Sequence, residues 1–190
     1  AKNNTDYNTK DLDMDMKMHK AIAIIQFKLE GQIIMRRPEF MMEDRLLLDK
    51  IDYENKTIVS EQVIYAMKDT NFPTVDKEHP YELTEEEQKV IQDLKFSFLN
   101  SHRLQRHMDF LFEKGCMYKR YNENLLYHGC IPLDGQGNFD GIEIDRNIYM
   151  GKEYLDYAER VVREVRKGEA GQDGLDFMWY LWTGKKSPLC

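Results

Sequence analysis

The sequence predicts a helix-rich α+β fold, and three observations indicate it. Several segments repeat apolar residues every three or four positions, which is the period of a helix with one buried face. Shorter segments gather β-branched and aromatic residues on either side of turn residues, which is typical of hairpins. The chain has 190 residues, of which 42% are hydrophobic and 32% charged, so it can bury the core of one globular domain.

The first helix is expected over residues 14–35, after a flexible lead-in over residues 1–13. Five apolar residues at three- and four-residue steps give this helix one buried stripe: Met18, Ile22, Ile25, Leu29 and Ile33. The helix ends before Pro38, because proline restricts the residue before it and lacks the N–H of the helical ladder. A hairpin or two short strands should then follow, since β-branched and aromatic residues lie on both sides of Asn55-Lys56.

The rest of the mainly helical part, which spans residues 14–115, is expected to hold two further helices. Thr84 and Glu87 match the capping box [ST]-x-x-[DE], in which each residue satisfies a free N–H of the other. A helix should therefore begin there, and a restarted second helix should stop at Gly115, a residue that commonly ends helices.

Residues 116–190 are expected to form a strand-turn segment followed by two helices. Apolar and aromatic residues flank Asn122-Glu123-Asn124, which predicts a hairpin, and a short strand is expected in "GIEID". The helix over 151–167 has one apolar face: Leu155, Ala158, Val161, Val162 and Val165. A last short helix is expected to plug the core with its aromatic side chains: Phe177, Trp179, Tyr180 and Trp182.

Composition excludes some functions and locations. The net charge of −7 argues against a nucleic-acid surface, which needs a basic patch for phosphates. The longest apolar run, "AIAII", is far shorter than the roughly 20 residues that span a bilayer, so no membrane partner is expected. The polar start of the chain is no signal peptide, and three cysteines without a C-x-x-C pair fit a reducing cytosol. A cytoplasmic location follows as an expectation.

His128 is the candidate functional residue. The apolar segment "NLLY" leads directly to it, and Gly129 follows. An imidazole at a strand end faces the edge of a sheet where ligands bind in open α/β folds, and the glycine permits close approach by a ligand or metal. From spacing alone, a hydrogen-bonded structural histidine remains the competing interpretation, because one histidine cannot hold a divalent ion.

The other four histidines are expected to be structural or solvated. His19 lies beside a helical stripe and His79 lies in a proline-containing loop. His102 and His107 are five positions apart, whereas two zinc-binding histidines on one helix face are four apart, as in H-E-x-x-H.

The segment "LLYHGCIPLD" resembles the HGG-(L/I)-SP element of the calcineurin-like metallophosphoesterases. Cys130 replaces the second glycine, and Ile131-Pro132 is one residue short of the usual spacing, so this motif alone is weak. Five separate segments, in order, resemble the class III fructose-1,6-bisphosphatases of bacteria: "HKAIAIIQFKLEGQIIMRRPEF", "RLLLDKIDYENKTI", "RHMDFLFEKG", "LLYHGCIPLDGQGNF" and "DFMWYLWTGKKSPL". The likeness covers the chain from about residue 17 onward.

The resemblance implies a part of a calcineurin-like α/β sandwich with helical insertions, and metal-assisted hydrolysis of the C1 phosphate of fructose 1,6-bisphosphate. His128 would be a ligand of one ion in a two-metal site, with manganese the expected metal. The family's other ligand motifs, G-D-x-x-D-R-G, G-N-H-D and G-H-T-P, are absent from this sequence. The chain is therefore interpreted as a single internal fragment over 1–190, which alone should be inactive.

Further residues near His128 are assigned no catalytic role. No general base lies at a recognisable sequence spacing from Cys130, so this residue is expected to pack in the structure rather than act as a nucleophile. Four acidic residues in or near the glycine-rich loop could belong to a metal shell, but turns also favour acids: Asp134, Asp140, Glu143 and Asp145. Two basic pairs could meet a sugar phosphate, although solvated or interface roles are favoured: Arg36-Arg37 and Lys185-Lys186.

Two other functions stay open at this stage. One is a non-catalytic helical interaction or cap module, which the missing ligands favour. The other is a different metallophosphoesterase such as a protein phosphatase, although the helical segments match the bisphosphatases. A piece cut from a larger sandwich exposes strand edges and apolar surface, so a homo-oligomer is compatible with either.

Overall fold

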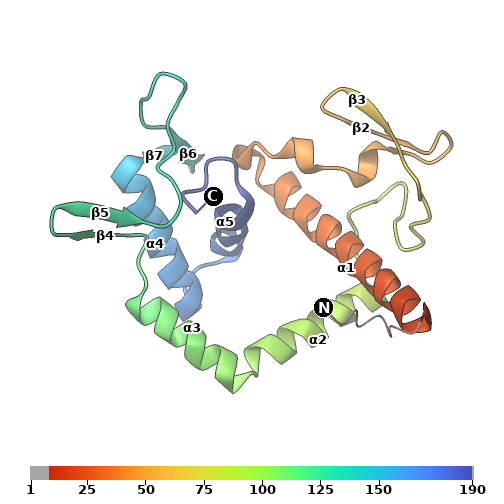
Figure 1. The fold of residues 1–190 in the computed structure, drawn as a ribbon, viewed down its shortest axis with the longest axis horizontal. Coiled ribbons are helices and arrows are strands. Elements are labelled where there is room, and N and C mark those ends of the chain that lie inside the picture. The colour runs from red at the N-terminus through yellow and green to blue at the C-terminus, as the bar shows by residue number, and fades with distance from the viewer. Residues whose placement is uncertain (1–8, 190) are drawn as a thin grey trace, which may run out of the picture. The chain divides into compact units, whose positions relative to one another are not determined.

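The computed structural model describes residues 9–189 (Figure 1). Within this range the fold is α+β, as predicted, and it is built from helices and small antiparallel sheets. The helices are α1 (Thr9–Arg36), α2 (Glu85–Leu99), α3 (His102–Lys114), α4 (Gly151–Lys167) and α5 (Gln172–Thr183). The strands are β1 (Ile51–Asp52), β2 (Thr57–Ser60), β3 (Val63–Ala66), β4 (Tyr118–Tyr121), β5 (Asn124–Tyr127), β6 (Gly141–Ile144) and β7 (Asn147–Met150).

The chain forms two compact units, and each unit is built from two separate stretches of the sequence. The first unit contains Ala1–Arg36 and Glu43–Gln92, and the second contains Arg37–Met42 and Asp93–Cys190. The predicted lead-in falls partly outside the described residues, and α1 begins at Thr9, earlier than expected. None of the helices in the described part of the chain is both long and apolar enough to cross a bilayer.

The core of the first unit forms where α1 meets the loop after β3. Ile24, Leu48 and Tyr81 are buried together, with part-buried side chains packed around them: Phe27, Leu46, Ile51, Phe72 and Val75. The predicted stripe of α1 is therefore wrong at its start, since Met18 and Ile22 are exposed while Ile24 is buried. The buried face is set by the side chains that pack on Ile24, Leu48 and Tyr81, and the Tyr81 ring also covers Gly31 so closely that an added Cβ would lie 2.1 Å from Cδ1.

The predicted capping box at the start of α2 is confirmed. The Thr84 hydroxyl accepts the Glu87 N–H at 3.2 Å, and the Glu87 carboxylate accepts the Thr84 N–H at 2.9 Å. Glu87 also accepts a hydrogen bond from Lys28 of α1. The cap thereby attaches the start of α2 to α1, although strands β1, β2 and β3 lie between the two helices in sequence.

The hairpins follow the predicted turns and add others. β1 and β2 pair around residues 53–56, as expected, and β2 also pairs with β3 through a turn at Glu61-Gln62 that the sequence analysis missed. β4 and β5 pair around Asn122-Glu123, both in the left-handed region, as the twist of a tight hairpin requires. β6 was predicted, but its partner β7 was not.

The core of the second unit lies between β6, α4 and α5. Leu155, Ala158 and Val161 of α4 are buried, as the predicted apolar face requires. Phe177 and Tyr180 of α5 are also buried, which confirms part of the aromatic plug. Trp182 is wrongly included in that plug, since it is 80% exposed and lies on the opposite side of the helix from the buried residues.

Candidate functional site

His128 lies directly after β5, as predicted, and its side chain is exposed. Among the described residues β5 pairs with β4 alone, in an antiparallel register that joins Tyr118 to Tyr127. The strand end is therefore the end of a hairpin. The expected crevice at the edge of an open sheet is not formed by this part of the chain.

The residues after His128 turn toward the end of the chain. The Cys130 N–H donates to the Pro188 carbonyl at 3.1 Å, and the Cys130 thiol contacts the Ser187 carbonyl at 3.4 Å. Cys130 is half-buried, and its packed setting agrees with the expected structural role. The backbone of residues 129–130 is thus fixed by contacts distant in sequence.

The metal expected from the resemblance can be compared with the donors present. Manganese prefers oxygen donors and accepts an imidazole within a mixed set, so His128 fits as one ligand only beside carboxylates. No group of three His, Cys, Asp or Glu side chains could hold a metal ion among those that the structure describes, in residues 13–189. One imidazole does not fix an ion, and the described residues do not complete a site.

Asp134 has a turn role in the glycine-rich loop. Its carboxylate accepts the backbone N–H groups of Gln136 and Asn138 at 2.9 and 2.8 Å, and the Asn138 side-chain amide at 3.0 Å. The Asn138 side chain, and then its backbone, lower the pKa of Asp134, because these donors favour the charged form. The carboxylate is occupied in holding the loop.

The other three acids are dispersed. Asp140 accepts a hydrogen bond from Lys186 at 2.8 Å, which with the Gly141 N–H lowers the pKa of its carboxyl. Asp145 lies in the β6–β7 turn with a left-handed backbone, and Glu143 is exposed on β6. The structure does not bring these groups together with His128 as a metal shell.

The two basic pairs differ in exposure. Arg37 is buried, contrary to a solvated role, and its guanidinium lies 2.6 Å from the Asp173 carboxylate and 2.9 Å from that of Glu39. Lys186 is paired with Asp140, whereas Arg36 and Lys185 are exposed. The other four histidines, His19, His79, His102 and His107, are exposed, as expected for surface roles.

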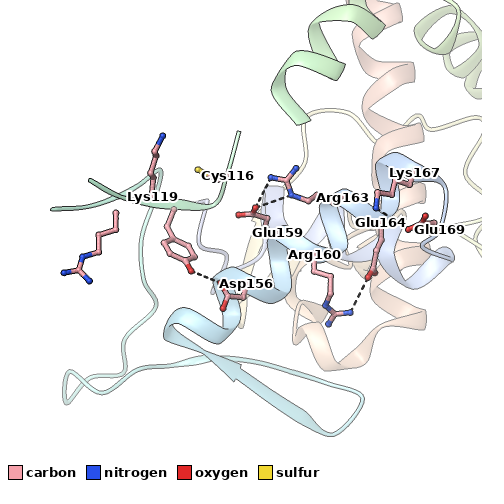
Figure 2. A pocket seen from close by; sticks show the side chains of 11 residues that line it. Cys116, Lys119, Asp156, Glu159, Arg160, Arg163, Glu164, Lys167 and Glu169 are labelled. Carbon is pink, nitrogen blue, oxygen red and sulfur yellow. Dashed lines mark hydrogen bonds and ion pairs between the residues drawn. The ribbon is translucent and has the colours of Figure 1, made fainter. Parts of the chain in front are cut away.

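The structure adds a charged hollow that the sequence analysis missed. It has a volume of about 690 Å³ and lies along β4 and α4 (Figure 2). Figure 2 shows Arg163 and Glu159 pointing toward one another, and Arg160 linked to Glu164. Lys119 of β4 and Cys116 also line it. Its signal in the sequence is the run of opposite charges four positions apart on one helix face.

The electrostatics of this hollow are largely compensated. The Tyr118 hydroxyl donates to Asp156 at 2.9 Å, and Lys152 lies 2.5 Å from the same carboxylate. The Lys152 hydrogen bond lowers the pKa of Asp156, and burial partly opposes this effect. The acids that line the hollow lie beside basic groups: Asp156 by Lys152, Glu159 by Arg163, Glu164 by Arg160 and Glu169 by Lys167.

Comparisons with known proteins bear on the whole chain. The family model described as Firmicute fructose-1,6-bisphosphatase matches residues 1–190. A protein named fructose-1,6-bisphosphatase class 3 from Alkaliphilus metalliredigens is 54% identical over 158 residues, which is 82% of this chain and 24% of the relative. Proteins of the same name from Clostridium botulinum and Clostridium novyi are 53% and 56% identical, over 81% and 80% of this chain and 23% of each relative.

The chain thus spans about a quarter of the length of the curated relatives it matches. No solved structure matches it significantly. The match to the family extends over every residue, including both units and the segment around His128. The chain therefore belongs to the Firmicute fructose-1,6-bisphosphatase family.

Proposed function

We propose that the full-length protein carrying this chain is a fructose-1,6-bisphosphatase. It would hydrolyse the C1 phosphate of fructose 1,6-bisphosphate with water, releasing inorganic phosphate, and act in gluconeogenesis in the cytoplasm. One observation carries the proposal: the family match extends over residues 1–190, with relatives of that name at 53–56% identity. These names favour a sugar bisphosphatase over a protein phosphatase.

The chain would be an internal segment of a calcineurin-like metallophosphoesterase. Two observations support this part of the proposal. The chain spans only 23–24% of its relatives. The strand-end segment "LLYHGCIPLD" also resembles the histidine element of that superfamily. A homo-oligomer of the full-length protein stays a prediction.

His128 would donate one imidazole nitrogen to a manganese ion whose other ligands lie elsewhere in the polypeptide. Its exposure and its place at the end of β5 leave the ring accessible. When bound, two divalent ions in such hydrolases activate a water and offset phosphoryl charge. Cations are needed locally, because a net charge of −7 repels an anionic sugar phosphate. The contribution of this chain is the orientation of one donor.

The non-catalytic alternative applies to the isolated chain. Since no group of three metal-ligating side chains forms among the described side chains of residues 13–189, the chain alone is expected to release no phosphate from fructose 1,6-bisphosphate, even with Mn²⁺. Robust metal-dependent turnover by the isolated chain would contradict this expectation.

The test of the full-length protein measures phosphate release from fructose 1,6-bisphosphate with Mn²⁺, together with bound metal. His128→Ala should reduce Mn²⁺ content and lower activity by about 100-fold or more, since even the outer-shell partners of metal ligands usually account for about 10- to 100-fold. His19→Ala removes an exposed imidazole of α1 and is the matched control, expected to keep both values. Full metal occupancy and wild-type rate in His128→Ala would remove His128 from the site.

A further inference from the structure

The segment after His128 is attached to a turn in the last residues of the second unit. Gly129 and Cys130 meet the backbone of Ser187, Pro188 and Leu189, more than fifty positions later. The Cys130 N–H donates to the Pro188 carbonyl at 3.1 Å, and the Cys130 thiol donates to the Ser187 carbonyl at 3.4 Å. Two adjacent carbonyls of this turn thus receive two donors from one residue. We name residues 187–189 the Ser187 turn.

The Ser187 turn is itself rigidly held. Ser187 is fully buried, and its hydroxyl donates to the Leu181 carbonyl at 2.5 Å while accepting the Leu189 N–H at 3.1 Å. The Ser187 N–H donates to the Gly184 carbonyl at 3.1 Å, just after α5 ends. A buried hydroxyl that both donates and accepts a hydrogen bond fixes the local geometry, because the loss of either bond leaves a buried polar group unpaired.

Gly129 is in close contact with the same turn. A Cβ added there would lie 2.6 Å from the Pro188 oxygen and 2.8 Å from the Leu189 carbonyl carbon. Real Cβ atoms do not come so near to backbone, and backbone cannot rotate aside as a flexible side chain can. Glycine at 129 is therefore needed for the chain to approach the turn directly after His128.

The same C-terminal stretch also holds the loop that follows. Lys186, next to the Ser187 turn, donates to Asp140 at 2.8 Å. The Asp140 N–H donates to the Pro132 carbonyl at 2.9 Å, which closes the loop between these residues. The segment from Gly129 to Asp140 is thus anchored at both ends to residues 186–189.

We propose that the Ser187 turn is a positioning element for His128, acting through Gly129 and Cys130. The inference rests on the proposed function, in which His128 is a metal ligand. The exposed ring is one residue from Gly129, and the hairpin holds it from the other side through the Tyr118–Tyr127 pair. With both neighbours fixed, the backbone that carries the imidazole is held in place, and this limits the positions from which the ring can reach a metal ion.

The test uses the full-length protein and measures the Kd for Mn²⁺, the EPR spectrum of bound Mn²⁺ and hydrogen exchange of the Cys130 amide. Gly129→Ala and Ser187→Ala should each raise the Kd about 10- to 100-fold, the range usual for residues that orient a ligand. Both should also alter the spectrum and speed exchange at Cys130. Gly135→Ala and Ser97→Ala are matched controls, since Gly135 has open space around it and Ser97 is exposed on α2.

Cys130→Ser and Cys130→Ala separate positioning from general stability. Serine keeps a donor toward the Ser187 carbonyl, so Cys130→Ser should retain most of the affinity for Mn²⁺. Cys130→Ala should bind Mn²⁺ at least about threefold more weakly. The thermal midpoint of both variants should stay close to that of wild type. Unchanged affinity and spectrum in Gly129→Ala and Ser187→Ala, with His128→Ala impaired, would overturn the positioning role alone. Unchanged metal binding in His128→Ala would overturn the ligand assignment and, with it, this inference.

Discussion

Lys28 and Glu87 form a buried ion pair that joins α1 to the first turn of α2. The Lys28 Nζ atom lies 2.7 Å from Glu87 Oε2, and the side chains are 0% and 8% exposed. Lys28 also donates to the Thr74 carbonyl at 2.5 Å, while Glu87 accepts the Thr84 N–H. The pair is therefore satisfied by hydrogen bonds on both sides, which a buried charge requires.

Replacing Lys28 by methionine should lower the free energy of unfolding of the first unit by about 3–5 kcal/mol. The cost arises because Glu87 would remain buried without its cation. Urea titration of the full-length protein, read by hydrogen exchange in α1 and α2, measures it. Lys17→Met is the matched control: its i,i+4 pair with Asp13 is exposed and should contribute at most about 0.5 kcal/mol. Equal effects of the two variants would contradict a structural role for the buried pair.

The same pair predicts an acid-dependent loss of stability. Burial alone would raise the pKa of Glu87, but the Lys28 hydrogen bond and further hydrogen bonds outweigh it and hold the pKa below its ordinary value of 4.5. A carboxyl whose pKa is lower in the folded state than in the unfolded state stabilises the fold fully when the pH is above its unfolded-state pKa. That stabilisation is lost as pH falls through the folded value, so the window begins near pH 4.5 and extends downward.

Glu87→Gln should therefore flatten the dependence of stability on pH below about pH 4.5, and Glu86→Gln should leave that dependence unchanged. Glu86 is the exposed neighbour on the same helix and controls for the loss of one negative charge at the helix start. Denaturant midpoints measured from pH 3 to pH 7 give the comparison. An unchanged acid slope in Glu87→Gln would assign the effect to other carboxylates.

Local chemistry made much of the fold predictable. The capping box at Thr84 and the turn at Asn122 specify short-range geometry, so the structure reproduces both. The burial of Lys28 could not be predicted, because lysine is rarely buried and its partner is far away in sequence. The division into two units is not marked in the sequence either. One boundary falls at 92–93, inside α2, where no linker composition marks it.

The candidate site was predictable only in part, for a related reason. A strand followed by His-Gly places His128 at a strand end, and the structure agrees. What supports this position is the turn at Ser187, which meets Gly129 through tertiary contacts that no local pattern reveals. The ligand role of His128 stays a prediction, since the described residues do not complete a metal site.

Gly31→Ala should destabilise the first unit although alanine usually stabilises a helix by about 1 kcal/mol over glycine. The new Cβ would lie 2.1 Å from the Tyr81 ring, which would have to move from its buried position and from its hydrogen bond to Asp49. We expect a net loss of about 2 kcal/mol in urea titration. In a Tyr81→Ala background the same substitution should become stabilising. A destabilising effect in both backgrounds would show that Tyr81 is not the cause.

Arg163→Met should loosen α3 from α4. The Arg163 guanidinium donates to the carbonyls of Phe112 and Gly115 at 2.6 and 3.0 Å, and to Glu159 at 2.9 Å, so it binds the free carbonyls at the end of α3. α3 has no buried residue, and this bridge therefore carries much of its attachment. The loss should be about 1–3 kcal/mol, since the bonds involve a charged donor.

Hydrogen exchange of the α3 amides measures this loss, because exchange reports local opening before global unfolding. Arg160→Met is the matched control: it lies on the same helix and pairs only with Glu164 among the described carboxylates, at 3.5 Å. Faster exchange in α3 for Arg163→Met, with normal exchange in α4, is the expected result. If α3 kept its protection, its apolar side chains alone would suffice to hold it, and the polar bridge would be dispensable.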